Sequence, residues 1–200
     1  MIVLAPDDGT APRRAMALED AIFRLVPDFI AKVEWAKKTY NARSETVAEK
    51  RTFRESWALG RRCIIPAELI YEPRYSDFGN AERWAIRQPG AVPMGIAGIY
   101  NEVAHPDGRK FFTMAMLTVN ADDHPFMQPF HKPGEEKRMV VILDPKDYMD
   151  WLSCSVAEAV AYLKPWHGPL EGAPALLPPR QKEPRARRGS EPPPATGDLF

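Results

Sequence analysis

The chain has 200 residues, of which 44% are hydrophobic, so it is long enough to bury the core of one domain and too short for two ordinary domains. Its 27 basic and 27 acidic residues balance, so affinity for a polyanion would have to come from a local basic face. The only cysteines are Cys63 and Cys154, without a CxxC pair or a Cys/His cluster. This excludes a disulfide framework and a zinc site, and we expect no metal and no cofactor.

The first residues, MIVLAPDDGTAPRR, hold a short apolar run followed by two acidic residues. That run is too short for a secretory signal or a membrane span. We therefore expect a cytoplasmic protein with no membrane partner, which also fits the low cysteine content.

Further along the chain, Asn41, Arg43 and Glu45 occupy alternate positions. If this stretch is extended, the three side chains point to one face, because side chains alternate along a strand. An amide, a guanidinium and a carboxylate on one face are suited to hold an anionic ligand and to move a proton beside it. The alternative is a solvent-exposed edge strand that ends in a helix cap.

The segment that follows carries the signals of a helix. Thr46 and Glu49 have the spacing of a capping box, and Phe53 and Trp57 lie four residues apart. The pattern predicts an amphipathic helix of about three turns over residues 46–59, with Trp57 in the core.

From residue 61 onward the chain is rich in β-branched and aromatic residues, interrupted by Pro-Gly and Asp-Gly pairs. These runs predict strands at residues 61–72, 82–88, 94–103, 110–120 and 138–143. The sequence HPDGR predicts a hairpin loop, and DPKDYMDWL and VAEAVAYL predict closing helices. Consecutive strands with short turns, flanked by helices, indicate an α+β fold with a mostly antiparallel, curled, barrel-like sheet.

The prolines gather at the C-terminal end, where residues 167–200 read HGPLEGAPALLPPRQKEPRARRGSEPPPATGDLF. Such a segment offers little apolar surface to offset the entropy of ordering, so we predict a disordered tail. The single folded domain then comprises residues 1–166.

Four stretches together resemble one known family. NARSETVAEK, RRCIIPAELIYEP, MGIAGIY and MLTVNADDHPFMQPFHKPGEEKRMVVIL follow one another in the order and spacing typical of the SRAP family, the SOS response-associated peptidase fold. The resemblance extends over about residues 23–152. It implies a protein that handles abasic sites in single-stranded DNA.

The resemblance also implies a chemistry and residue roles. Family members use a cysteine directly after the initiator methionine, whose free amine and thiol condense with the ring-opened abasic sugar into a thiazolidine cross-link. By position, Asn41 would help to place the amine and Arg43 would bind a backbone phosphate. Glu72 would transfer protons, and His131 would take part in that proton transfer. Imine formation needs a proton donor and a proton acceptor, and a carboxylate with a histidine supplies both near neutral pH. The alternative is a solvent-facing strand carboxylate at Glu72 and an ordinary loop histidine at His131.

The start of the chain departs from the family pattern. Position 2 is Ile2 rather than cysteine, and no cysteine precedes Cys63, which lies in an apolar strand where we expect a buried structural thiol. The family has further residues before the point where this chain begins to match, so we expect the N-terminal part of the domain to be incomplete. Two explanations stay open: a shortened gene product whose full version begins Met-Cys, or a member that kept the DNA cleft and lost the covalent chemistry.

Basic and aromatic residues around the NARSE motif resemble a groove for single strands. The residues that we expect to bind DNA are Arg43, Lys37, Lys38, Trp35, Phe29 and Arg138. The family pattern FGLVPxW reads FRLVPDF here, so Phe29 stands near the tryptophan position and can still stack on a base. Arg24 replaces the glycine, which would cause strain where a positive φ is needed. The alternative for the basic residues is a solvated helix face.

The last residues, TGDLF, resemble the short peptide by which bacterial repair proteins dock on the replication sliding clamp. Leu199 and Phe200 would fill an apolar pocket of the clamp at the end of a flexible tether. The alternative is an incidental chain end.

Three functions therefore remain in view. The leading hypothesis is a monomeric DNA-damage response protein that recognises abasic sites in single-stranded DNA, with covalent capture by the complete protein. The second is a non-covalent single-stranded DNA-binding module without the nucleophile. The third is a peptidase limited to removal of its own N-terminal residues, since no Ser/His/Asp or Cys/His motif supports a general protease.

Overall fold

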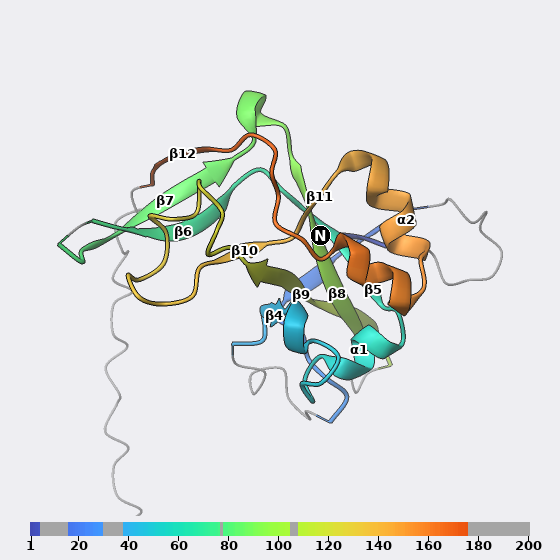
Figure 1. The fold of residues 1–200 in the computed structure, drawn as a ribbon. Helices are drawn as coiled ribbons and strands as arrows, with labels where there is room; N and C mark the ends of the chain where they lie inside the picture. The colour runs from blue at the N-terminus through green and yellow to red at the C-terminus, as the bar shows by residue number, and fades with distance from the viewer. Residues whose placement is uncertain (5–15, 30–37, 77, 105–107, 176–200) are drawn as a thin grey trace, which may run out of the picture.

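The computed structural model describes residues 1–4, 16–29, 38–76, 78–104 and 108–175. Its main element is a mostly antiparallel nine-stranded sheet that curls into a half-barrel (Figure 1). The central path runs β10-β9-β8-β5-β1-β2, and the remaining strands join it at β8 and β9. The predicted α+β fold with a curled sheet is therefore confirmed.

The main sheet is built from short outer strands around the long hairpin of β8 and β9. Its strands are β1 (Ile2–Leu4), β2 (Ala17–Glu19), β3 (Ala21–Phe23), β4 (Asn41–Arg43), β5 (Arg62–Ala67), β8 (Met94–Ala104), β9 (Lys110–Asn120), β10 (Arg138–Val140) and β11 (Ile142–Leu143). Strands β8 and β9 pair from Gly98↔Met116 to Ala104↔Lys110, which confirms the predicted hairpin. Residues 105–107 of its loop lie outside the described residues.

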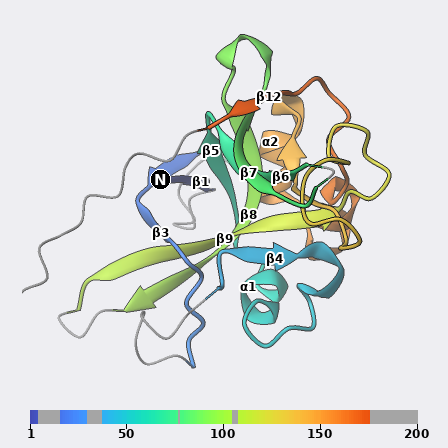
Figure 2. The ribbon, with the colours of Figure 1, turned by 90° about the vertical axis from the view of Figure 1, so that its left-hand side faces the viewer.

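The N-terminal segments complete the sheet from both sides. Strand β1 pairs antiparallel with β2 and β5, and Ile2 is fully buried. Strands β3 and β4 instead run parallel to β9, as Figure 2 shows. The second position, where the family resemblance implies a reactive cysteine, is thus a core position in this structure.

The predicted strand at residues 138–143 is two strands. Strand β10 pairs with β9, whereas β11 pairs with β8. Between them, the Val141 N–H donates to Leu117 O at 2.9 Å and its carbonyl accepts from Ala97 N at 2.8 Å. The prediction of one strand was wrong because the curl of the sheet makes the chain change partners at Val141.

A second sheet packs beside the first, with the order β12-β7-β6. Its strands are β6 (Ile70–Tyr75), β7 (Ala81–Arg87) and β12 (Glu171–Pro174). Strand β12 pairs with β7 over its whole length, so the fold continues beyond the boundary predicted at residue 166. Gly172 allows this close pairing, because a Cβ there would lie 3.2 Å from the Trp84 ring and 3.3 Å from the Phe126 ring. Residues 176–200 of the predicted tail, with Leu199 and Phe200, lie outside the described residues.

The helical segments are short. They are η2 (Ser44–Thr46), α1 (Arg54–Ala58), η3 (Pro89–Ala91), η4 (Pro145–Asp147), α2 (Tyr148–Ser153), α3 (Val156–Ala159) and η5 (Val160–Tyr162). The closing helices are confirmed, and Ser155 and Glu158 form a complete capping box at α3. Among the described residues, no helix combines the length and apolar character needed to cross a bilayer.

The helix predicted over residues 46–59 was largely wrong. Only α1 is α-helical, and the chain before it forms the 3₁₀ helix η2 followed by turns. Glu45 accepts hydrogen bonds from Arg138 and from the Asn120 backbone, so tertiary contacts fix the start of the segment against its helical propensity. The predicted apolar pattern is confirmed over the last turn, where Trp57 is 4% exposed and its backbone N–H donates to Phe53 O.

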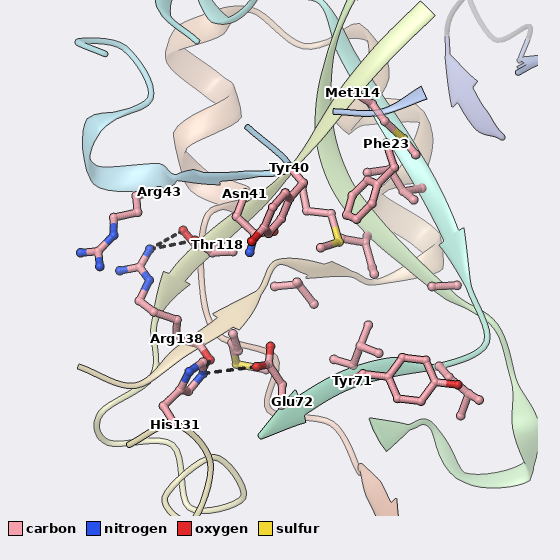
Figure 3. A pocket seen from close by; sticks show the side chains of 18 residues that line it. Phe23, Tyr40, Asn41, Arg43, Tyr71, Glu72, Met114, Thr118, His131 and Arg138 are labelled. Atoms are coloured by element: carbon pink, nitrogen blue, oxygen red, sulfur yellow. Dashed lines mark hydrogen bonds and ion pairs between the residues drawn. The ribbon is translucent and has the colours of Figure 1, made fainter. Parts of the chain in front are cut away.

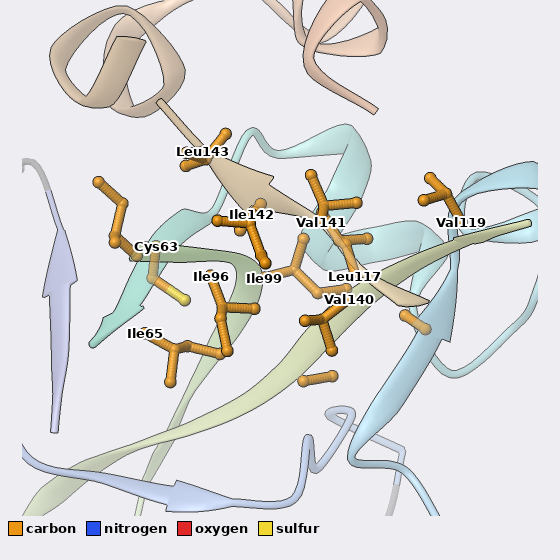
Figure 4. Packing of buried hydrophobic residues seen from close by; sticks show 14 of the residues in the cluster. Cys63, Ile65, Ile96, Ile99, Leu117, Val119, Val140, Val141, Ile142 and Leu143 are labelled. Atoms are coloured by element: carbon orange, nitrogen blue, oxygen red, sulfur yellow. The ribbon is translucent and has the colours of Figure 1, made fainter. Parts of the chain in front are cut away.

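The core lies on both faces of the central strands, since the consecutive β5 residues Cys63, Ile64 and Ile65 are all buried, and α2 packs against this strand. Figure 4 shows side chains from β5, β8, β9, β10 and β11 meeting there, Cys63 among them. Cys63 is fully buried, and burial raises the pKa of its thiol, which confirms the predicted structural role. The Trp151 indole N–H donates to Cys63 O at 3.0 Å and ties α2 to β5.

Candidate functional site

A cavity of about 700 Å³ opens between the end of β4 and β9 on one side and β6 on the other (Figure 3). Most of its wall is apolar. The polar side chains that line it are Asn41, Arg43, Glu72, Thr118, His131 and Arg138. The aromatic side chains that line it are Phe23, Tyr40 and Tyr71. The sequence therefore identified most of the polar residues of the cavity, but it did not identify Thr118, Phe23 or Tyr71.

Strand β4 places Asn41 and Arg43 on the cavity wall. Its parallel register sets Asn41 beside Met116 and Arg43 beside Thr118, while Ala42 between them is fully buried. The predicted alternation is thus confirmed for these two residues. Glu45 lies beyond the strand in η2, so it joins the site through its hydrogen bonds rather than through strand alternation.

Glu72 and His131 lie together on the wall opposite Asn41 (Figure 3). The Glu72 Oε2 and His131 Nε2 atoms are 3.7 Å apart, and each side chain is 21% exposed. Burial raises the pKa of Glu72 from its ordinary value of 4.5 to about 7. The alternative of a strand carboxylate that faces solvent is therefore wrong, and Glu72 populates both protonation states near neutral pH.

Backbone contacts orient His131. Its backbone N–H donates to Pro73 O at 2.9 Å, which ties it to β6, and its Nε2 lies 2.7 Å from Arg138 O. A carbonyl can only accept, so this contact assigns the proton to Nε2 and leaves Nδ1 as the acceptor of the neutral ring. His131 adopts a φ of 61°, a left-handed backbone conformation that is uncommon for residues other than glycine. These contacts fix the imidazole beside Glu72.

Arg138 organises the polar end of the cavity. Its guanidinium makes two 2.9 Å hydrogen bonds to Glu45, a 2.7 Å bond to Glu136 and a 2.7 Å bond to Thr118 O. Its side chain is only 12% exposed. Burial lowers the pKa of Arg138, but the bonds to Glu45 and Glu136 outweigh that effect and raise it above its ordinary value. Arg138 therefore shapes the site, and the contact of its side chain with DNA stays a prediction.

Arg43 is the accessible cation of this group. Its side chain is 58% exposed, and its Nη1 lies 2.6 Å from Glu136 Oε2. A surface ion pair of this kind is weak, because both groups remain in water and salt screens them. The guanidinium can therefore exchange its carboxylate partner for another anion.

Two other predicted DNA-binding residues, Phe29 and Lys38, do not line the cavity. Phe29 is exposed, and Arg51 stacks on its ring at 4.2 Å from the ring centroid. Lys38 is exposed and does not line the cavity. Trp35 and Lys37 lie outside the described residues. Arg24 is not among the described residues with positive φ, so its replacement of glycine causes no backbone strain.

The described lining of the cavity offers proton transfer but no nucleophilic amine or thiol. It contains a carboxyl group, an imidazole, an amide and two guanidinium groups, and neither lysine nor cysteine. The described residues also hold no cluster of three His, Cys, Asp or Glu that could bind a metal ion. Such a site suits a polar or anionic ligand on which a proton is to be moved.

Comparison with known proteins identifies a family with this architecture. A family model described as SOS response associated peptidase (SRAP) matches residues 2–174. A solved structure of a protein from Bordetella bronchiseptica has 36% sequence identity and a TM-score of 0.71. The match covers 82% of this chain and 77% of the Bordetella chain. A second structure, of a protein from Bacteroides thetaiotaomicron, has 26% identity and a TM-score of 0.60. The match covers 75% of this chain and 66% of the Bacteroides chain.

A curated relative has a more specific name. The abasic site processing protein YoqW of Bacillus subtilis (strain 168) is 30% identical over 129 residues, which are 64% of this chain and 54% of YoqW. The chain thus matches about half the length of that relative. Because the family model extends over most of the chain and the solved structures share its fold, the chain belongs to the SRAP family.

Proposed function

We propose that this protein recognises abasic sites in single-stranded DNA and acts on the sugar of the lesion in the cavity between β4 and β6. The observation that carries the proposal is the pairing of Glu72, whose pKa is raised to about 7, with His131 at 3.7 Å in an open cavity. Membership of the SRAP family and the name of the relative YoqW support the same substrate.

The chemistry of an abasic sugar explains why these groups are needed. The sugar interconverts between a closed hemiacetal and an open aldehyde, so one proton must reach the ring oxygen and another must leave the hydroxyl group. Glu72 supplies a proton donor when protonated and an acceptor when ionised, and near pH 7 both forms are present. The His131 imidazole, 3.7 Å from the Glu72 carboxyl group, provides a second group that can exchange a proton. Asn41, on the opposite wall, can hydrogen-bond the sugar or an incoming amine.

Phosphate groups flank the lesion, and the cavity offers one exposed guanidinium beside the proton-transfer groups. Arg43 can contact a phosphate with a forked pair of hydrogen bonds, which lysine cannot make. Tyr40 and Phe23 contact each other at 5.9 Å between ring centroids and provide an apolar wall against which a neighbouring base can stack.

Covalent capture of the abasic sugar is the more specific part of the proposal. An N-terminal amine would attack the aldehyde and release water as the imine forms, and the adjacent thiol would then add to the imine carbon to close a thiazolidine. We propose this step for a form of the protein that begins Met-Cys. The alternative, a non-covalent binding module, is favoured by one observation: position 2 is a buried isoleucine, and the described cavity lining holds no cysteine or lysine.

The proposal is tested by fluorescence anisotropy with two labelled single strands, one undamaged and one with a stable abasic analogue at its centre. We expect tighter binding of the abasic strand at the same salt concentration, and equal affinity would contradict the proposal. A denaturing gel with a natural, aldehydic abasic site then decides between the two forms. A shifted band only for a version extended to begin Met-Cys indicates covalent capture, and no shift for either version indicates the non-covalent module.

A further inference from the structure

The carboxylate of Glu136 occupies a position that suits a phosphate group. Three donors converge on it: Arg43 Nη1 at 2.6 Å, Arg138 Nη1 at 2.7 Å and Asn120 Nδ2 at 3.1 Å. Two guanidinium groups and an amide around one anion are the arrangement by which proteins bind a phosphodiester. The hydrogen bond from Arg138 lowers the pKa of Glu136, with help from Asn120 and Arg43, so this carboxylate is an anion at neutral pH.

Two of the three donors belong to the wall of the cavity. Arg43 and Arg138 line it together with Glu72 and His131. An anion at the position of the Glu136 carboxylate would therefore lie beside the groups to which we assign proton transfer. This is where a phosphate next to an abasic sugar would lie if the sugar entered the cavity.

Glu136 can leave this position without disrupting the rest of the site. It belongs to residues 132–137, a turn between His131 and β10 in which Gly134 has a φ of 78°. The backbone of this turn is held by Lys137, whose N–H donates to Asp122 at 2.7 Å. Arg138 keeps its bonds to Glu45 and Thr118 O when Glu136 moves away. When Glu136 moves away it gives up the exposed pair with Arg43 and the hydrogen bonds from Arg138 and Asn120, and an incoming phosphate can accept from the same three donors.

The family resemblance already implies that Arg43 binds a phosphate; we propose that Glu136, bonded to Arg43, Arg138 and Asn120, occupies this phosphate position until a phosphodiester group of the strand displaces it. The inference rests on the proposed function, because it takes the strand that enters the cavity to be DNA. Displacement breaks the same ion pair for a damaged and an undamaged strand. Glu136 therefore lowers the affinity for both strands by a similar factor and leaves their ratio unchanged.

The test compares Glu136→Gln with Glu135→Gln. Glu135 is the neighbouring acid, its side chain is 65% exposed, and it forms an ion pair with Lys132 at 3.9 Å, so the control removes the same charge without touching the phosphate site. For Glu136→Gln we expect the Kd for both strands to fall by about twofold to fivefold, the range that one exposed ion pair allows. Glu135→Gln should bind as the wild type does. Thermal melting of each variant checks that the fold is unchanged.

A double variant distinguishes displacement of Glu136 by the strand from a general effect of the lost negative charge. When Arg43→Gln is combined with Glu136→Gln, the gain from the second substitution should largely disappear, because the exposed donor is absent. Equal affinities for Glu136→Gln and Glu135→Gln, or weaker binding by Glu136→Gln, would overturn the inference. If the wild type bound both strands equally well, that result would instead contradict the proposed function. The comparison of Glu136→Gln with Glu135→Gln on an undamaged strand would still decide the inference.

Discussion

The raised pKa of Glu72 predicts how the stability of the protein depends on pH. Burial raises this pKa from 4.5 to about 7 in the folded protein, whereas the unfolded chain keeps the ordinary value. Between these two pH values the folded state holds a proton that the unfolded state has lost. The contribution to stability is therefore fully present below about pH 4.5 and is lost as the pH rises through about 7.

Glu72→Gln removes this dependence, because glutamine is neutral at every pH and has nearly the same shape as the protonated acid. At about 1.36 kcal/mol per pH unit, the shift corresponds to roughly 3 kcal/mol of unfolding free energy. We expect wild type and variant to be about equally stable near pH 4.5, and the variant to be more stable above pH 8 by up to roughly 3 kcal/mol. The variant should also lose proton transfer to the abasic sugar.

Urea unfolding from pH 4.5 to 8.5, followed by tryptophan fluorescence, measures this difference. Glu68→Gln serves as the control, since Glu68 is an exposed acid shortly before the same strand. The control should follow the wild-type curve at every pH. A difference between wild type and Glu72→Gln that stays constant with pH would refute the reasoning, because it would mean that Glu72 ionises alike in the folded and unfolded states.

Three further substitutions or reactions test the fold. Gly98→Ala should lower the unfolding free energy by about 1–3 kcal/mol in thermal melts, because a Cβ there would lie 3.0 Å from Ala115 O and 2.8 Å from a methyl group of Ile65; a neutral effect would contradict this packing. Asn101→Ala should cost about 1–3 kcal/mol by the same assay, since Asn101 is buried and donates to Val26 O at 2.8 Å. Iodoacetamide should leave Cys63 unmodified in the native protein by mass spectrometry, and fast labelling would show that its thiol is accessible.

The fold class could be predicted from the sequence because the residue composition of the strands and the turn residues between them indicate the same hairpin. The long strands β8 and β9 are rich in β-branched and aromatic residues, and a short loop with Asp107-Gly108 joins them as a hairpin. The split between β10 and β11 could not be predicted, because Val141 differs from its neighbours only in its hydrogen-bond partners across the curled sheet. Strand β12 was missed for a similar reason: its pairing with β7 does not depend on apolar side chains of its own.

In the candidate site, too, contacts between distant residues and the burial of side chains could not be predicted from the sequence. Asn41, Glu72 and His131 were found through the resemblance to the family, and the structure brings all three to one cavity. The role of Glu136 as the partner of Arg43 was not predicted, because the two residues are 93 positions apart and no local pattern connects them. The raised pKa of Glu72 likewise depends on burial, which a strand pattern with exposed neighbours did not indicate.

The central claim, that the abasic sugar meets Glu72 in the cavity, is tested most directly by NMR of the Glu72 side-chain carboxyl carbon. Its chemical shift is followed from pH 5 to 9 in the free protein, with an undamaged single strand and with a strand that carries a stable abasic analogue. We predict a titration near pH 7 in the free protein and a changed midpoint and chemical shift only with the abasic strand. Identical titration curves with both strands bound would contradict the account.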